Sequence, residues 1–361
     1  MSERQARRPK AIPRTAYLVL GMHRSGTSAA TQLLASAGAD LPANPMPGDE
    51  HNEQGYFEPW KIAILNDGRL RAAASAWDDV FAFPFRPLPD AAERDWLARA
   101  GALFGEEYGR ATFPLMKDPR ATVLMPFWRE VLKAEGVAAR CVIPVRRPLA
   151  VAGSLRRRDG FTDEKSVLLW AAYMLAAEAY TRDLPRAFVG YDALLQDWRA
   201  EAGRIEAAHG APLPRLTQAA ARRIDQFLSP DLRHNAADAG LARLGWAGEL
   251  ADAVHRWFVA AANGDAADRS LLEDAAAELA RRADEVGVLV SPMARDLDAA
   301  RAELLDLRAQ VDQLRLEMER QQRAMELGWQ SDLKRLEIVL EAERRTMARA
   351  SELLGEALAE D

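Results

Sequence analysis

The feature that most constrains the fold is a glycine-containing loop between a short apolar segment and a longer, periodic one. It lies in YLVLGMHRSGTSAATQLL, residues 17–34. Residues 17–20 predict a buried strand, and the run after Gly26 has the apolar spacing of a helix. A strand that enters a helix in this way points several backbone N–H groups and the positive end of the helix dipole at one place. The segment therefore predicts an anion-binding loop.

This loop differs from the version that binds nucleoside triphosphates in the position of its cation. That version ends in Gly-Lys-Ser/Thr, whereas here Gly26 is followed by Thr27 and Ser28, and Arg24 lies inside the loop. Phosphoryl transfer normally needs Mg²⁺ and the loop lysine, and no apolar strand of this sequence ends in an acidic pair suited to a metal. An arginine can instead neutralise a smaller anion, such as a phosphosulfate, without a metal. The alternative is an ordinary turn in which Ser25 caps the helix.

Short apolar runs alternate with longer helical patterns over most of the chain. Strands are expected at residues 17–20, 112–116, 140–145 and 187–189. Helices are expected near residues 25–37, 91–104, 121–135, 148–158 and 164–180. This alternation predicts a mainly parallel sheet with helices on both faces and ligands at the carboxyl ends of the strands. We therefore expect a P-loop-like α/β domain over residues 15–235.

The regions that flank this domain differ from it in composition. Residues 1–14 have the composition of a disordered basic arm, and residues 236–290 are Ala-rich with helical periodicity, which predicts an all-helical extension. From about residue 295, apolar residues recur every seven positions, at Leu297, Leu304, Val311, Met318 and Met325. Leu307 and Leu314 follow the second and third of these by three positions. The pattern predicts a C-terminal coiled coil over residues 295–355. A long amphipathic helix packed on its own domain is the alternative.

The seven-residue pattern loses its phase near Gly328. It resumes more weakly at Leu333, Leu336, Leu340 and Met347. We expect Gly328 to mark a bend or the end of the first paired segment. Because an exposed apolar stripe is prone to association, the pattern predicts a homo-oligomer, most simply a dimer, held through residues 295–350. Pairing with a different partner protein is the other possibility.

Composition argues against several classes of protein and indicates the cellular compartment. The chain has 361 residues, of which 49% are hydrophobic and 28% charged, so it is long and apolar enough for a sizeable core. The net charge of −6 argues against general nucleic-acid binding. The single cysteine, Cys141, excludes an internal disulfide framework and suits a reducing compartment. The longest apolar run, residues 167–177, is too short to span a membrane, and no signal-peptide core follows the basic N-terminus. We therefore expect a cytoplasmic protein.

Two motifs resemble those of sulfotransferases that use 3′-phosphoadenosine 5′-phosphosulfate (PAPS). GMHRSGTS, residues 21–28, resembles the loop that holds the 5′-phosphosulfate. PVRRPLAVAGSL, residues 144–155, resembles the motif in which an Arg at a strand end and a Ser eight residues later hold the 3′-phosphate. Arg146 and Ser154 have that spacing, and Arg147 stands where the family often has Asn or Asp. The resemblance implies that these two segments bind opposite ends of one nucleotide.

Three shorter segments extend the resemblance. LMKDPR resembles the Lys-Asp-Pro segment of tyrosylprotein sulfotransferases, which implies that Lys117 contacts the transferring sulfuryl group. GYFEPW resembles the Phe-Glu-Pro segment of carbohydrate sulfotransferases, which implies that Glu58 is the general base. His51 is the alternative base, because cytosolic sulfotransferases use a histidine. FVGYDALLQDW resembles a strand that is followed by a nucleotide contact, here Tyr191. The resemblance covers about residues 15–235 and is closest to bacterial domains found with polysaccharide and glycolipid genes.

Together the motifs imply a PAPS-dependent sulfotransferase that transfers a sulfuryl group to a hydroxyl without a metal. Arg24 and Lys117 would stabilise charge at the reacting group, and Glu58 would remove the acceptor's proton. The implied cofactor-binding residues are Arg24, Ser25, Gly26, Thr27, Ser28, Arg146, Ser154 and Tyr191. A carbohydrate or glycolipid acceptor follows from family analogy alone. The alternatives are a P-loop kinase or NTPase, and a non-enzymatic assembly protein whose coiled coil is the active part.

Overall fold

Four short strands form a parallel sheet. The computed structural model describes residues 13–48, 56–228 and 240–357 and divides into two units, residues 1–298 and residues 299–361. The strands lie in the first unit and are β1 (Thr15–Val19), β2 (Leu115–Lys117), β3 (Ala138–Val145) and β4 (Arg186–Gly190). Their order in the sheet is β2-β1-β3-β4, with every pair parallel. Each expected strand is present with shifted ends, and the predicted α/β fold class is confirmed.

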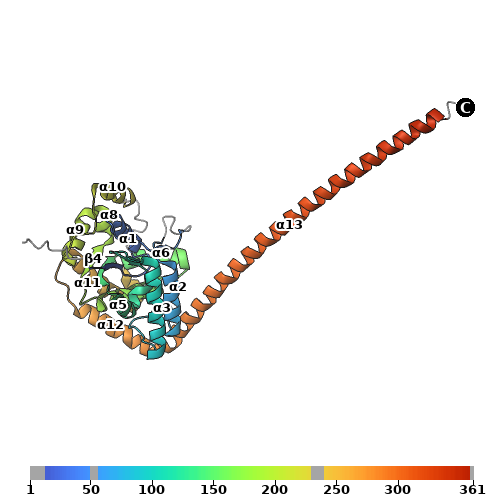
Figure 1. The fold of residues 1–361 in the computed structure, drawn as a ribbon. Helices are drawn as coiled ribbons and strands as arrows, with labels where there is room; N and C mark the ends of the chain where they lie inside the picture. Colours follow the sequence, from blue (N-terminus) through green and yellow to red (C-terminus); the bar gives the residue numbers. More distant parts are fainter. Residues whose placement is uncertain (1–12, 49–55, 229–239, 358–361) are drawn as a thin grey trace, which may run out of the picture. The chain divides into compact units, whose positions relative to one another are not determined.

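Helices connect and follow these strands. Up to β4 they are α1 (Thr27–Ser36), α2 (Trp60–Ala72), α3 (Asp90–Tyr108), α4 (Arg120–Val123), α5 (Met125–Ala134), α6 (Pro148–Asp159) and α7 (Asp163–Ala179) (Figure 1). After β4 they are α8 (Tyr191–Gln196), α9 (Trp198–His209), α10 (Gln218–Phe227), η2 (Leu241–Leu244), α11 (Gly245–Asn263), α12 (Ser270–Arg282) and η3 (Ala283–Gly287). The helix expected near residues 121–135 is two helices, because Pro126 at the start of α5 begins a new one. The sequence did not predict α2.

Both faces of the sheet are covered, as the alternation predicted. Successive side chains of a strand point to opposite faces. Ala16 and Leu18 of β1 belong to one apolar cluster, which also takes in α5, α7 and α11. Tyr17 and Val19 belong to the other, which takes in α1, α8 and α9. All five residues of β1 are buried because this strand is central.

The Ala-rich region after residue 236 contributes to the same core as the sheet. Helix α11 packs along α7, and its residues Val254, Trp257 and Phe258 are buried in the first of the two clusters. The Phe258 ring lies 5.4 Å from that of Phe188 in β4, edge to face. The expected helical character is therefore present in residues 240–290, and these helices complete one face of the sheet.

The last helix, α13 (Val288–Ala357), has 70 residues and runs through Gly328 without interruption (Figure 1). Its beginning belongs to the first unit, where Asp298 forms an ion pair with Arg71 at 2.6 Å. From residue 299 on, α13 is the second unit. No helix in the described ranges combines the length and apolar character that a membrane crossing requires. The helix that the predicted coiled coil requires is therefore present. The pairing of this helix with a second helix stays a prediction.

The burial of α11 predicts a contrast between two neighbouring residues. Phe258 is fully buried and Val259 is 38% exposed. We expect Phe258→Ala to lower the free energy of unfolding by about 3–5 kcal/mol, because it leaves a cavity in the core. Val259→Ala should change it by about 0.5 kcal/mol or less. Urea denaturation followed by circular dichroism measures both, and equal small effects would contradict the placement of α11 in the core.

Candidate active site

The loop between β1 and α1 has the backbone geometry of a close approach to a ligand. Gly21, Arg24 and Gly26 have φ angles of 140°, 67° and 91°, all positive. The Gly21 N–H donates to Thr122 Oγ1 at 2.8 Å, which fixes the start of the loop. Helix α1 begins at Thr27, so its first N–H groups lack intrahelical acceptors and point back to the loop. A left-handed conformation is uncommon for a residue with a side chain, as Arg24 has.

Ser25 does not cap α1, so the capping role that the ordinary-turn alternative gave it is wrong. The N-terminal cap position is Gly26, and no side chain accepts a hydrogen bond there. The Ser25 hydroxyl is buried and has no hydrogen-bond partner among the described residues. Thr27 is also buried, whereas Ser28 is half-buried.

Gly26 is required because an aromatic ring occupies the space of a side chain. A Cβ at this position would lie 2.3 Å from Cδ2 of Tyr191, far inside van der Waals contact. Tyr191 begins α8 directly after β4. The guanidinium carbon of Arg146 lies 4.4 Å from the centre of the same ring. The structure therefore brings Tyr191, Arg146 and the loop together, as the motif interpretation expects.

A direct hydrogen bond joins the two principal motifs. Arg24 Nε donates to Ser154 Oγ at 2.8 Å. Arg146 Nη1 donates to the backbone carbonyl oxygen of Arg24, also at 2.8 Å. Arg146 follows β3 and Ser154 lies in α6, while Arg24 follows the neighbouring strand β1. Segments 130 residues apart thus meet at the carboxyl ends of two adjacent strands.

Cations crowd one another at this end of the sheet. Burial lowers the pKa of Arg24, and the charges of Arg158, Arg146 and Arg157 lower it further. The pKa of Arg146 is lowered first by burial and also by Arg157. Repulsion between guanidinium groups thus adds to the effect of burial in both shifts. An anion bound among them would relieve that repulsion, so the electrostatics favour an anionic ligand.

His23 lies in the same loop and is neutral at pH 7. Burial lowers its pKa well below the usual value, and Arg158, Arg120, Lys117 and Arg24 reinforce the shift. Its ring makes an edge contact with Trp77 at 4.9 Å between centroids. Its Nε2 atom has no hydrogen-bond partner among the described residues.

A buried ion pair lies at the end of β2. Lys117 Nζ donates to Glu58 Oε1 at 2.7 Å and to the carbonyl oxygen of Tyr56 at 2.8 Å. Both charged side chains are about 3% exposed. Lys117 is aligned with Val19 in the register of β1 and β2, so it lies at the same edge of the sheet as the loop. Phe57, just before Glu58, has a positive φ of 58°, which turns the chain into α2.

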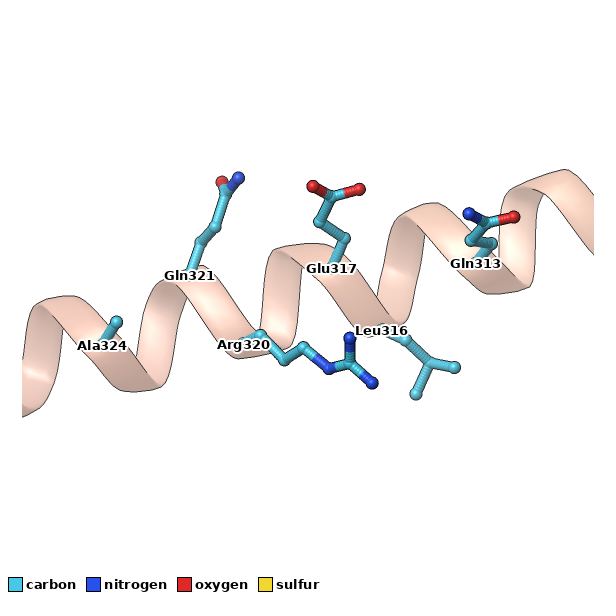
Figure 2. A pocket seen from close by; sticks show the side chains of 6 residues that line it. All are labelled: Gln313, Leu316, Glu317, Arg320, Gln321 and Ala324. Carbon is cyan, nitrogen blue, oxygen red and sulfur yellow. The ribbon is translucent and has the colours of Figure 1, made fainter.

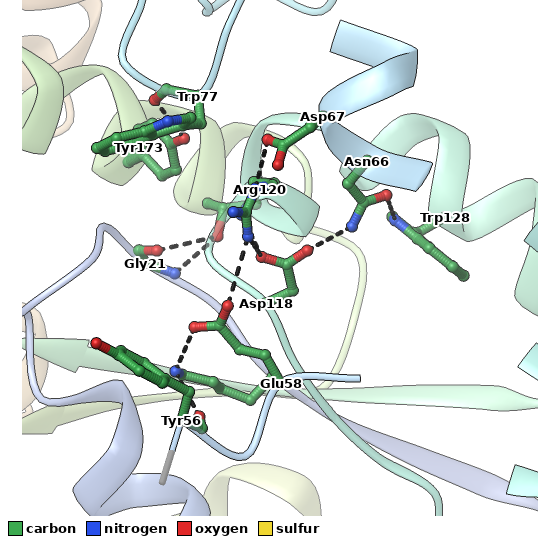
Figure 3. A network of polar contacts seen from close by, with 12 residues as sticks. Gly21, Tyr56, Glu58, Asn66, Asp67, Trp77, Asp118, Arg120, Trp128 and Tyr173 are labelled. Atoms are coloured by element: carbon green, nitrogen blue, oxygen red, sulfur yellow. Dashed lines mark hydrogen bonds and ion pairs between the residues drawn. The ribbon is translucent and has the colours of Figure 1, made fainter. Parts of the chain in front are cut away.

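Arg120 connects Glu58 to two further carboxylates (Figure 3). It contacts Asp67 at 2.6 Å, Asp118 at 2.8 Å and Glu58 at 3.4 Å. Burial alone would lower the pKa of Arg120, but the three carboxylates outweigh it and raise the pKa well above its usual value. Across the described ranges, no three His, Cys, Asp or Glu side chains are grouped so as to hold a metal ion. The carboxylates at this site therefore surround a guanidinium.

Behind this network, Asn66 of α2 completes the hydrogen bonds of Asp118. Its amide nitrogen donates to Asp118 Oδ2 at 2.7 Å, and its amide oxygen accepts from Trp128 Nε1 at 3.0 Å. Asn66, Asp118 and Trp128 are all fully buried. These buried hydrogen bonds hold Asp118 in place, and Asp118 in turn positions Arg120 and, through it, Glu58.

Sequence reasoning found part of this arrangement. It singled out Arg24, Lys117, Glu58 and the 3′-phosphate motif, which the structure places along the ends of β1, β2 and β3. It missed Arg120 and Asp67. Arg120 stands in LMKDPR, one residue after the proline, but nothing in that segment indicates its three carboxylate partners. His51, the alternative base, lies outside the described residues.

Comparison with known proteins finds similarity to solved structures but not to a protein family or a curated protein. The sequence matches no protein-family model and no curated protein. Among solved structures, the chain is similar to a sulfotransferase domain from the Synechococcus PCC 7002 olefin synthase, with a TM-score of 0.38 and 16% identity over 77% of this chain and 98% of that one. It is also similar to a sulfotransferase domain from the curacin biosynthetic pathway, with a TM-score of 0.34 and 13% identity over 58% and 77% of the two chains. At such identities a shared activity does not follow, so the functional assignment rests on the site.

The environment of Asp67 predicts a pH-dependent stability. Burial raises the pKa of Asp67 to about 6, although Arg120 opposes the shift. Between its pKa in the unfolded chain, about 4, and this value, the folded protein holds a proton that the unfolded chain has lost. As the pH rises through this window, the free energy of unfolding of the wild type should therefore fall relative to that of Asp67→Asn. The expected fall is on the order of 2–3 kcal/mol. Urea denaturation of both proteins from pH 4.5 to 7.5 measures the difference, and a flat difference would contradict the raised pKa.

Proposed function

We propose that this protein is a PAPS-dependent sulfotransferase that transfers a sulfuryl group to a hydroxyl of an acceptor. The observation that carries the proposal is the hydrogen bond from Arg24 to Ser154, together with that from Arg146 to the Arg24 carbonyl. These contacts unite a phosphate-type loop and a second anion motif at one helix N-terminus. A carbohydrate or glycolipid acceptor is the class that the Phe-Glu-Pro segment favours.

The donor is assigned from the distribution of positive charge. In this proposal the first N–H groups of α1, from Thr27 and Ser28, hold the 5′-phosphosulfate. Arg146 and Ser154 hold the 3′-phosphate, and Arg24 lies between the two groups because its side chain already reaches Ser154. ATP has no phosphate at the 3′ position and would leave this second set of donors unused. The site therefore favours PAPS over ATP on charge and on hydrogen bonding.

The acceptor side of the reaction is assigned to the buried ion pair. Glu58 takes the proton of the acceptor hydroxyl, whose oxygen forms a bond to sulfur as the bond from sulfur to the donor phosphate breaks. Lys117 and Arg24 stabilise the negative charge that develops on the leaving phosphate oxygen. In the described structure Glu58 and Lys117 contact each other at 2.7 Å. In this proposal an acceptor hydroxyl that reaches Glu58 displaces Lys117 from it, which frees Lys117 for the sulfuryl group.

Choice of nucleotide is the first test. Adenosine 3′,5′-bisphosphate should raise the melting temperature, because a ligand that binds only the folded state stabilises it, by about 2.7 kcal/mol at a hundred times its Kd. ATP with Mg²⁺ at the same concentration should raise it less. Arg146→Ala should reduce the response to the bisphosphate. The control is Arg147→Ala, which removes a half-exposed neighbour that contacts Asp192 at 3.7 Å. An equal or larger shift with ATP would sink the proposal and favour the kinase or NTPase.

Turnover is the second test, with labelled PAPS and a panel of glycans, glycolipids and small alcohols. Glu58→Gln should leave the bisphosphate response nearly unchanged and lower turnover by roughly a hundredfold or more. Lys117→Ala should also reduce turnover more than binding. Because both residues form a buried pair, the melting temperature of each variant is measured first. Normal turnover by Glu58→Gln, with none by His51→Ala, would transfer the role of base to His51.

A further inference from the structure

We propose that α13 pairs with α13 of a second copy of this chain, as a parallel, in-register, two-stranded coiled coil. The proposal does not depend on the proposed sulfuryl transfer. It concerns α13 from Asp296 on, most of which belongs to the second unit, residues 299–361, and which the structure describes to residue 357. It rests on the exposure of one stripe of apolar side chains and on the charges that flank that stripe.

The apolar stripe is open along the whole helix. Its residues are between 46% and 69% exposed up to Met325, namely Leu297, Leu304, Leu307, Val311, Leu314, Met318 and Met325. From Leu304 to Met318 the spacing alternates between three and four positions, and Leu297 and Met325 lie seven positions beyond each end, so these residues occupy a and d positions of successive heptads. Of the five a residues only Val311 is β-branched, and together with Leu307 and Leu314 at the neighbouring d positions it forms the combination that favours two strands. A stripe of this length is association-prone when left in water.

The flanking charges identify what covers the stripe. With Leu304 at position a, every e position of the first three heptads carries a positive charge, at Arg301, Arg308 and Arg315. The g positions carry acidic or neutral polar residues, namely Asp296, Glu303, Gln310 and Glu317. A chain with opposite charges on the two sides of its own seam is complementary to a second copy of itself.

Orientation follows from the same charges. In a parallel pair, each g residue faces the e residue five positions later on the other chain, so Glu303 faces Arg308 and Asp296 faces Arg301. In an antiparallel pair, e positions face e positions and g positions face g positions. That arrangement would oppose Arg to Arg and Glu to Glu. The charge pattern therefore selects the parallel, in-register pair and disfavours the antiparallel one.

Side-chain directions on α13 agree with these positions (Figure 2). Glu317 and Gln321, at positions g and d, project from one side of the helix, whereas Leu316 and Arg320 project from the other. The hollow that these side chains line is the open flank of a single helix. Leu316 at position f lies outside the seam and is 56% exposed. It supplies a matched control for substitutions within the seam.

The loss of phase near Gly328 is a change of spacing within a continuous helix. Trp329 lies eleven positions after Met318 and continues the stripe toward Leu333 and Leu336. With Leu333, Leu340 and Met347 at a positions, eight positions instead of seven separate Met325 from Leu333, so the heptad frame is displaced by one residue. Beyond it, Asp332 and Glu337 would face each other in the parallel pair. The register is therefore set before Gly328.

Two measurements on the full-length protein test the pairing: the mass of the wild type, and the mass of variants substituted within the seam. Sedimentation equilibrium at micromolar concentration should give the mass of a dimer. Leu304→Asp combined with Leu314→Asp should give a monomer, whereas Leu316→Asp should remain a dimer. A monomeric wild type overturns the proposal, as does a trimer or tetramer, or a dimer that survives the double seam substitution.

Charge exchange tests the predicted pairs. Glu303→Arg places Arg opposite Arg308 twice in the dimer and should weaken it about tenfold. Arg308→Glu should weaken it similarly. An equimolar mixture of the two variants should form a heterodimer of wild-type strength, since both contacts again join opposite charges. A mixture no stronger than either variant alone contradicts this register.

Cross-linking tests the orientation. Leu307→Cys and Leu314→Cys should each form an intermolecular disulfide on oxidation, because the same d positions meet only in a parallel, in-register pair. Asp312→Cys, at an exposed b position, should not. The native Cys141 is fully buried and gives little background. Cross-linking at one of the two d positions, or at neither, overturns the proposal.

Discussion

The central position of β1 in a parallel sheet determines where the whole candidate site lies. β1 is hydrogen-bonded to β2 on one side and β3 on the other, and Val19 is aligned with Lys117 and with Val142. Because the three strands run in the same direction, their carboxyl ends share one edge. The loop after β1, Lys117 at the end of β2 and Arg146 after β3 are therefore neighbours, although more than a hundred residues separate the first from the last.

Charge is divided between two groups at this edge. Burial lowers the pKa values of Arg24 and Arg146, and repulsion from neighbouring arginines lowers them further. The carboxylates of Glu58, Asp67 and Asp118 instead converge on Arg120, which is almost fully buried. Ion pairs that are taken out of water persist only when each charge is matched and hydrogen-bonded. The acidic group is thus paired within the protein, and an anion bound by the basic group stays a prediction.

Local patterns predicted the elements whose partners are near in sequence or wholly apolar. The β1–loop–α1 unit and β3 followed by α6 are such cases. Helix α2 was not predicted, because its buried face contains Asn66 and Arg69, whose partners Asp118 and Glu93 are supplied by other elements. Arg120 was missed for the same reason, because its partners Glu58 and Asp67 lie in other segments of the chain. Periodicity predicted the helices after residue 236 but could not indicate that α11 packs on α7. An apolar stripe shows which face of a helix is buried, but it does not show which element covers that face. The catalytic and binding roles of the site residues stay predictions.

The left-handed conformation of Arg24 has a consequence for preorganisation. A non-glycine residue with a φ of 67° is costly by roughly 1–2 kcal/mol, and Arg146 stabilises it through a hydrogen bond to the Arg24 carbonyl oxygen. The ring of Tyr191 against Gly26 restricts the loop from the other side. The conformational entropy of the loop is therefore lost when the chain folds rather than when a ligand arrives. A nucleotide that fits this loop gains the full strength of its contacts without first having to order the backbone that makes them.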